Sequence, residues 1–270
     1  MSLLKRTFVV CLALILSIAP ADAALSPESI PAVFDELLKV PTLSNPAMIV
    51  IDGSTGQIIY EKNIYSQRKP ASVMKVLAGA VTLDYLDPLS VFNTSVNIAP
   101  EEKTVVIRGS FDPWISLDHN VARKMNRASL PYMGFNTLSA VKEANGGSLK
   151  NYKVLYSNLY SKDIANLKAF WAKRGFKPVF KQVTDEEAFL AQGDLVASEN
   201  SPTVQKILDF MMLWSDNLLA DRLAGIAARA AGYSPNIKGI ETIFRTLLAQ
   251  FEIDDSKLVV ADASGLSKKN

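Results

Sequence analysis

The stretch Pro70-Ala71-Ser72-Val73-Met74-Lys75 opens the most apolar helical segment of this chain. Apolar side chains occupy most positions from Ser72 to Leu86, so we expect a helix that is buried on most of its sides. Pro70 disfavours a helical residue before it, which places Ser72 at the helix N-terminus. Ser72 and Lys75 then lie one turn apart on one helical face. This arrangement indicates a nucleophilic serine beside its base.

The spacing Ser-x-x-Lys also begins at Ser2, Ser66 and Ser139, so the spacing alone does not identify a site. Ser2 lies in the N-terminal leader, and the lysine of the Ser66 copy directly precedes Pro70, where helical dihedral angles are disfavoured. No strongly apolar helix follows Ser139. Ser72 meets each requirement, and its alternative interpretation is an ordinary N-capping serine.

Lys75 is unusual because it lies on a nearly all-apolar helix, where a bare ammonium group is costly. Burial favours the neutral amine, which can accept a proton from a serine hydroxyl. The alternative is a lysine whose ammonium group reaches solvent past the apolar surface.

A second pattern, Ser-x-Asn, occurs at several places, which include Ser95, Ser198 and Ser215. Of these three, Ser215 alone lies in a tight link between two long apolar helices, which we predict for residues 203–214 and 218–232. A hydroxyl there can relay a proton to a leaving amine, and the Asn217 amide can bind a peptide carbonyl. The alternative is a polar, capped turn between two helices.

The composition describes a globular protein: 49% of the residues are hydrophobic, and Gly and Pro number 13 each. The 29 basic residues nearly balance the 27 acidic ones. No surface suited to neutralising phosphates is indicated, so we expect no nucleic-acid partner.

The N-terminus has the order of a secretory signal peptide. Lys5 and Arg6 precede the apolar segment 7–19, and Ala21-Asp22-Ala23 supplies small residues at a cleavage site. We predict cleavage after Ala23, export across the cytoplasmic membrane, and a location in the periplasm or cell-wall space. An uncleaved anchor is the alternative. The one cysteine, Cys11, lies in the leader, so we expect no disulfide in the mature chain. No later stretch is long and apolar enough to span a membrane, so we expect no stable membrane span in the mature chain.

The pattern of apolar and polar residues in the remaining chain changes near residue 88. We expect a helix at 30–40, a hairpin of strands 47–51 and 57–61, a strand at 104–107 and a polar, turn-rich segment at 117–151. A strand at 153–156, a helix at 162–173 and a strand at 178–183 follow. The last two elements are a helix at 239–251 and a short strand at 258–261.

Ser-x-x-Lys followed by Ser-Asp-Asn provides two of the three motifs of penicillin-interacting serine acyl enzymes. The chain resembles the class C penicillin-binding proteins, the serine D-Ala-D-Ala carboxypeptidase/endopeptidase family, over residues 46–115 and 194–270. Further matching segments are Ile51 to Gly56 with Ile59-Tyr60, Arg108 to Pro113, Val196 to Ser198, Leu218, and Asp262 to Ser267 with Asn270.

The resemblance implies an α/β fold with the sheet-and-helix body of serine β-lactamases and transpeptidases and an inserted small α/β domain. We assign residues 24–88 and 197–270 to an incomplete catalytic body and residues 89–196 to the insertion. It further implies that Ser72 is the nucleophile, Lys75 its base, Ser215 a proton relay and Asn217 a substrate-binding residue. The implied partners are peptidoglycan stem peptides and β-lactam antibiotics, with no cofactor.

The third family motif, Lys-Thr-Gly, is not among these 270 residues. In the family it binds the terminal carboxylate of the substrate, and its strand supplies an oxyanion donor. We therefore expect a chain that is truncated before this motif, lacks the C-terminal strands of the sheet, and hydrolyses D-Ala-D-Ala peptides poorly.

Two other functions remain open: a catalytically inactive cell-wall-binding protein, and a β-lactamase or transpeptidase relative. The missing Lys-Thr-Gly favours the first, whereas the intact Ser72 and Lys75 pair disfavours it. His119 is the one histidine, so we expect no zinc site, no histidine-based triad and a surface position for this residue.

Overall fold

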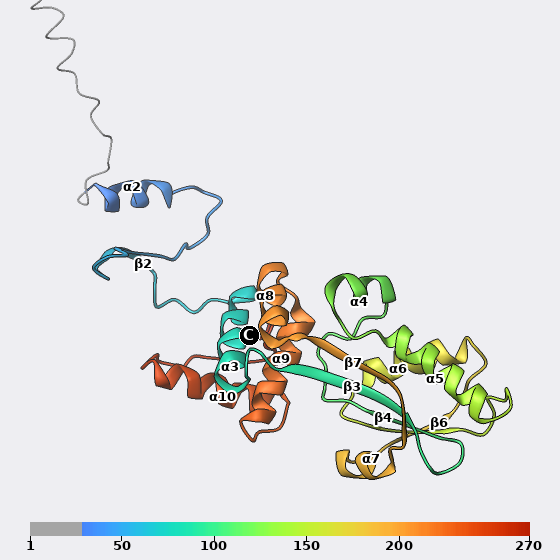
Figure 1. Cartoon of the computed structure of the whole chain (residues 1–270). Coiled ribbons are helices and arrows are strands. Elements are labelled where there is room, and N and C mark those ends of the chain that lie inside the picture. Colours follow the sequence, from blue (N-terminus) through green and yellow to red (C-terminus); the bar gives the residue numbers. More distant parts are fainter. Residues whose placement is uncertain (1–28) are drawn as a thin grey trace, which may run out of the picture. The chain divides into compact units, whose positions relative to one another are not determined.

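The computed structural model describes residues 29–270, which belong to two compact units divided between Arg68 and Lys69 (Figure 1). The predicted leader and its cleavage site after Ala23 lie outside the described residues.

The first unit contains a helix and a hairpin, as the sequence predicted. Its elements are α2 (Ile30–Leu37), β1 (Met48–Ile51) and β2 (Ile58–Lys62), with the two strands antiparallel. Asp52 shapes the hairpin turn, because its carboxylate accepts from the backbone N–H groups of Ser54 at 2.9 Å and Thr55 at 2.8 Å. The hydroxyl of the buried Tyr60 donates to Asp35 at 2.9 Å, which ties β2 to α2.

The second unit begins with a group of helices, here called the helical cluster. Its members are the 3-10 turn η1 (Ala71–Val73), α3 (Met74–Tyr85), α8 (Val204–Trp214), α9 (Asn217–Ala230) and α10 (Ile237–Gln250). Apolar side chains from all four α-helices share one core. All four α-helices were predicted from the sequence close to their observed ends. Ser72 lies within η1, one turn ahead of the regular helix.

The α3 helix is buried on most of its sides, as the sequence predicted, and only a narrow stripe is exposed. Met74, Lys75 and Ala78 are buried, whereas the side chains of Val76 and Leu83 are 55% and 47% exposed.

A five-stranded sheet forms the other part of this unit. Its strands are β3 (Val91–Ile98), β4 (Thr104–Arg108), β5 (Lys153–Ser157), β6 (Val179–Gln182) and β7 (Asp194–Thr203). The order is β6-β5-β4-β3-β7, with β4, β5 and β6 parallel to one another and β3 antiparallel to both of its neighbours. Strand β3 reaches the helical cluster, where its Phe92 joins the core, and β7 contacts α8.

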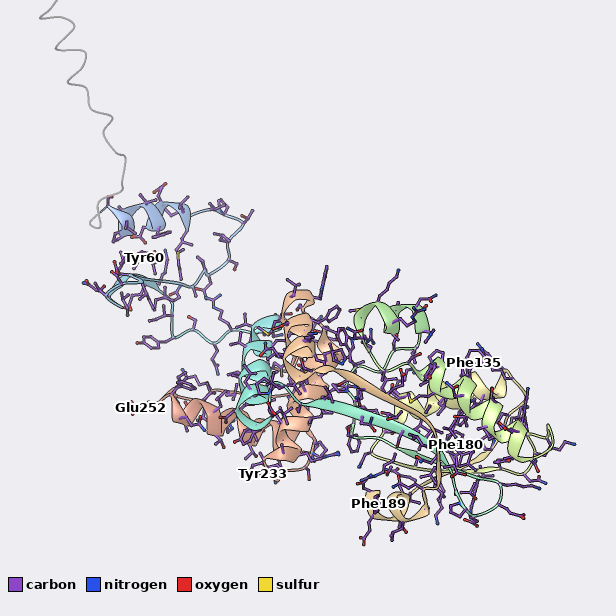
Figure 2. All side chains as sticks on the ribbon, in the orientation of Figure 1. Tyr60, Phe135, Phe180, Phe189, Tyr233 and Glu252 are labelled. Carbon is purple, nitrogen blue, oxygen red and sulfur yellow. The ribbon has the colours of Figure 1, made fainter. Side chains whose placement is uncertain are left out.

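Helices cover both faces of the sheet. They are α5 (Leu130–Ala144), α6 (Ser161–Ala172) and α7 (Asp185–Ala191), while α4 (His119–Met125) precedes α5 and packs against it. Helices α5 and α6 pack on the face that carries Val105 and Ile107, and α7 packs on the opposite face against Val106. Figure 2 shows Phe135 of α5 and Phe189 of α7 on opposite sides of the strands.

Several sequence predictions are wrong in this region. Residues 117–151 contain α4 and α5 rather than turns alone, and residues 258–261 form no strand. Strands β3 and β7 and helix α7 were not predicted. The buried residues of α5 recur at helical spacing, but Gly134 and polar residues interrupt the apolar pattern; they are Leu130, Met133, Gly134, Thr137, Leu138 and Val141.

The sheet and its helices occupy residues 91–203, close to the insertion predicted at 89–196. Strand β7 continues beyond residue 196 and leads directly into α8. That this segment folds apart from the rest of the chain stays a prediction.

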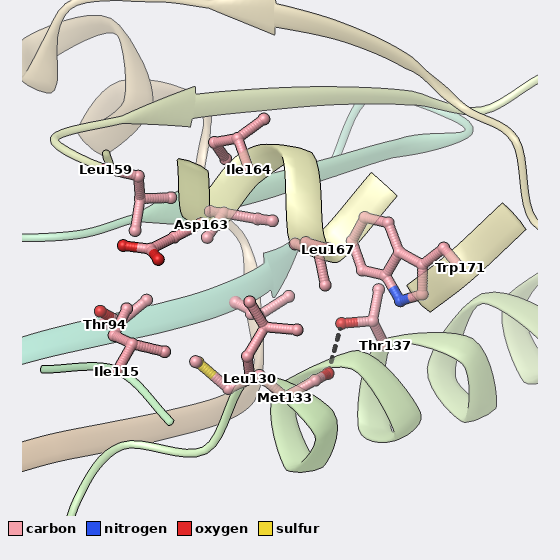
Figure 3. A pocket seen from close by; sticks show the side chains of 12 residues that line it. Thr94, Ile115, Leu130, Met133, Thr137, Leu159, Asp163, Ile164, Leu167 and Trp171 are labelled. Atoms are coloured by element: carbon pink, nitrogen blue, oxygen red, sulfur yellow. Dashed lines mark hydrogen bonds between the residues drawn. The ribbon is translucent and has the colours of Figure 1, made fainter. Parts of the chain in front are cut away.

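A small cavity lies between the sheet, α5 and α6 (Figure 3). Its volume is about 20 Å³, the space of about one water molecule. Apolar side chains line most of it, and Thr94, Thr137 and Asp163 contribute polar atoms. The cavity is too small for a peptide, and neither Ser72 nor Ser215 lines it.

A buried group of charges joins the sheet to the helical cluster. Asp163 of α6 pairs with Arg222 of α9 at 3.3 Å, and both side chains are buried. Beside them, Asp112 accepts from the Trp114 backbone N–H at 2.7 Å, while its second oxygen has no hydrogen-bond partner within residues 29–270. Burial raises the pKa of Asp112 to about 7, against the opposing effects of this hydrogen bond and of Arg127 and Arg222.

Asp112→Asn should stabilise the protein increasingly as the pH rises. The folded carboxyl keeps its proton up to about pH 7, whereas the unfolded one loses it near its ordinary value of 3.8, so the wild type loses stability between these values. Urea unfolding should show the gain of Asp112→Asn over the wild type growing by about 2–3 kcal/mol from pH 5 to pH 8. Asp84→Asn, at an exposed position of α3, is the control. A gain independent of pH would contradict this account.

Candidate active site

Ser72 lies at the surface of the second unit, with its hydroxyl between two other functional groups. Its Oγ accepts hydrogen bonds from Lys75 Nζ at 3.1 Å and from Ser215 Oγ at 2.9 Å. The preceding Ala71 has a φ of +48°, a left-handed conformation that non-glycine residues rarely adopt. The chain thus turns sharply into η1 and presents an exposed serine one turn before a buried lysine.

Lys75 is 2% exposed, and its amino group is fully surrounded by acceptors. Besides Ser72 Oγ, Nζ donates to Asn217 Oδ1 at 2.6 Å and to the carbonyl oxygen of Ser264 at 2.9 Å. Three acceptors suit an ammonium group, which explains how the charge is tolerated away from water. The alternative that Lys75 reaches solvent is therefore wrong.

The link Ser215-Asp216-Asn217 directs two side chains toward Ser72. Ser215 ends α8 in a left-handed conformation with a φ of +54°. Asp216 then caps α9, because its Oδ1 accepts from the backbone N–H of Leu219 at 2.9 Å. Asn217, the first residue of α9, reaches Lys75. The structure thus brings together all four predicted site residues, which come from η1, α3 and the α8–α9 link.

The contribution of Ser264 was missed, although its segment was recognised in the sequence. Asp262 organises this loop, because its carboxylate accepts from the backbone N–H groups of Gly265 and Ser267, both at 2.6 Å, and from Asn270 Nδ2 at 2.8 Å. Burial raises the pKa of Asp262, but these hydrogen bonds outweigh it and leave the pKa below its ordinary value. The loop is therefore built around an ionised carboxylate.

Gly265 brings the 262–267 loop into contact with Ala71 of η1. Its φ is +78°, and a Cβ at this position would overlap the backbone carbonyl oxygen of Ala71. Only glycine accommodates both the backbone conformation and this contact. The loop thus contacts the backbone of Ala71 through Gly265, and its Ser264 carbonyl accepts a hydrogen bond from Lys75.

The other candidate serines lie elsewhere. Ser139 is an interior residue of α5, and Ser95 and Ser198 pair on the neighbouring strands β3 and β7. His119 is exposed at the start of α4, where its Nδ1 lies 3.1 Å from Ser129 Oγ. Within residues 29–270, no group of three or more His, Cys, Asp or Glu side chains could hold a metal ion.

This geometry fits two family models that meet inside the chain. The model of the D-Ala-D-Ala carboxypeptidase 3 (S13) family matches residues 151–270, and that of the D-alanyl-D-alanine carboxypeptidases matches residues 36–162. Both models describe D-Ala-D-Ala carboxypeptidases, and together they match residues 36–270. This confirms the family that the motifs predicted, and each of the four site residues falls within one of the two matches.

Solved structures confirm the α/β fold class. Penicillin-binding protein 4 from Haemophilus influenzae is 14% identical, with a TM-score of 0.56 over 82% of this chain and 71% of that one. The same protein in complex with a β-lactam is 16% identical, with a TM-score of 0.60 over 87% of this chain and 73% of that one. A search of curated proteins gives no match.

Gly265→Ala should disable the site, because the added Cβ displaces either the loop from Lys75 or Ala71 from its position beside Ser72. We expect the rate at which penicillin acylates the protein to fall at least about tenfold, the effect of about 1.4 kcal/mol. Gly232→Ala is the matched control, since Gly232 also has a positive φ, +85°, but has open space around it. Equal acylation rates for the two variants would show that contact with Ala71 is unimportant.

Proposed function

We propose that this chain is a serine D-Ala-D-Ala carboxypeptidase/endopeptidase that works through an acyl-enzyme on Ser72. The observation that carries the proposal is the position of Ser72 Oγ, 3.1 Å from Lys75 Nζ and 2.9 Å from Ser215 Oγ. A hydroxyl within hydrogen-bond reach of an amine and of a second hydroxyl has both a base and a proton relay.

In acylation, Ser72 Oγ attacks the carbonyl carbon of the peptide bond between the two D-alanine residues. Its proton passes to Lys75 Nζ, which acts as base when neutral. The resulting ammonium group keeps Asn217 Oδ1 and the Ser264 carbonyl as acceptors, so the new charge is stabilised without rearrangement. The N-terminal end of α3 adds a favourable field for the developing oxyanion.

Collapse of the tetrahedral intermediate breaks the carbon–nitrogen bond. The leaving amine receives a proton from Lys75 through Ser215 Oγ, and an ester remains on Ser72. Water then attacks this ester, its proton returns to Ser72 Oγ through Lys75, and the shortened peptide leaves. Asn217 turns its Oδ1 toward Lys75, and its amide nitrogen can donate to the substrate's backbone carbonyl.

Peptidoglycan stem peptides and β-lactam antibiotics are the ligands that we assign to this site. Both present a carbonyl to a serine nucleophile, and the H. influenzae relative is described as a complex with a β-lactam. The intact hydrogen bonds among Ser72, Lys75 and Ser215 favour an enzyme over a catalytically inactive cell-wall-binding protein.

We also propose that the protein is exported and acts in the periplasm or cell-wall space. The support is the order of charged, apolar and small residues in the leader and a substrate class found outside the cytoplasm. Across residues 29–270, no helix is both long and apolar enough to span a bilayer. Mass spectrometry of the exported protein should find Ala24 as its first residue, and a retained Met1 would contradict cleavage.

Ser72→Ala should abolish covalent labelling by penicillin, because no other hydroxyl takes the place of its Oγ beside Lys75. Intact-mass spectrometry should show one added penicilloyl group on the wild type and none on this variant. Ser139→Ala is the matched control, since Ser139 is also exposed and is also followed by a lysine three residues later. Labelling of Ser72→Ala at the wild-type rate would refute the proposed function.

A further inference from the structure

Asp221 lies one helical turn after Asn217 on α9, and none of the steps above uses it. Its side chain is partly buried, and Oδ1 accepts from the backbone N–H of Ala263 at 2.9 Å. The backbone N–H of the next residue, Ser264, also lies close enough to this carboxylate to lower its pKa. Asp221 therefore holds the backbone at Ala263 and Ser264, and this backbone places the Ser264 carbonyl within hydrogen-bond distance of Lys75.

These contacts connect Lys75 to α9 in two ways. From α9, Asn217 contacts Lys75 directly, while Asp221 contacts it through the backbone of the 262–267 loop. Gly265 of the same loop rests against Ala71. The loop thus depends on two carboxylates, Asp262 from within and Asp221 from α9.

The charges that face Asp221 are Lys75 from α3 and Asp262 from the loop. Burial raises the pKa of Asp221, the charge of Asp262 raises it further, and the hydrogen bonds from the loop and the charge of Lys75 act in the opposite direction. The attraction between the Asp221 carboxylate and a positive charge on Lys75 is mutual, so removing the carboxylate removes a favourable interaction of that charge.

We propose that Asp221 is a positioning residue for the acylation of Ser72. It holds the backbone of Ala263 and Ser264 so that the Ser264 carbonyl accepts from Lys75, and its charge stabilises the ammonium group that proton transfer from Ser72 creates. This inference rests on the proposed function of Ser72 and Lys75.

The test measures the rate constant for acylation by penicillin from pH 5.5 to pH 10, using the full chain and intact-mass spectrometry. Asp221→Asn keeps an oxygen acceptor but loses the charge, and Asp221→Glu keeps the charge but changes its position. Asp209→Asn removes an exposed carboxylate of α8 and serves as control. Melting temperatures show which variants are folded.

For Asp221→Asn, the ammonium form of Lys75 loses a stabilising charge, so the rising limb of the pH profile should move to lower pH by about one unit. The maximal rate constant should fall about tenfold, the size expected when a hydrogen bond to a charged group is weakened. Asp221→Glu should keep the wild-type midpoint while its maximal rate falls. Asp209→Asn should match the wild type in both.

The inference is overturned if Asp221→Asn gives the wild-type profile, or if both Asp221 variants lose rate with an unchanged midpoint, as a merely structural role would cause. If Asp221→Asn does not fold, a shifted midpoint for Asp221→Glu would equally contradict the proposal. Failure of the proposed function is distinguishable from these results, because then the wild type itself would not be acylated at Ser72.

Discussion

The buried amino group of Lys75 makes three hydrogen bonds, and the arrangement of the active site depends on them. Each acceptor belongs to a different segment: Ser72 in η1, Asn217 at the start of α9 and the Ser264 carbonyl in the 262–267 loop. A charge that is 2% exposed is tolerated only when its donors are used, so a displacement of any one segment leaves a buried donor unsatisfied. This requirement fixes the segments together.

Local backbone features of the surrounding fold hold these three segments in place. A left-handed Ser215 and the capping Asp216 set the angle between α8 and α9. On the other side, Gly265 permits backbone contact with Ala71, and Asp262 shapes the loop. The side chains of Ser72 and Ser215 nevertheless stay exposed, so in the proposed mechanism a buried base serves a nucleophile that a peptide can reach.

Helical periodicity explains how much of this site could be predicted from the sequence. The relation of Ser72 to Lys75 follows from one helical turn, and the apolar runs on either side of Ser215 indicate two helices. The role of Ser264 could not be predicted in this way, because a backbone carbonyl acts whatever the side chain. Asp221 likewise gave no signal, since a partly buried aspartate on a helix has no distinctive neighbours in sequence.

The errors in the fold have similar physical causes. Helix α5 was missed because Gly134 packs closely against α6, where glycine is needed despite its low helix propensity. The apolar run at 258–261 was read as a strand, yet Val260 is buried against the helical cluster while Val259 is 56% exposed in an irregular segment. In both places tertiary packing decided the outcome.

A crystal structure of the chain after reaction with penicillin tests the central claim most directly. The account predicts an ester between Ser72 Oγ and the opened β-lactam carbonyl, with Lys75 Nζ still bound to Asn217 and to the Ser264 carbonyl. An ester on another serine, or a lysine that has left these two acceptors for solvent, would contradict it.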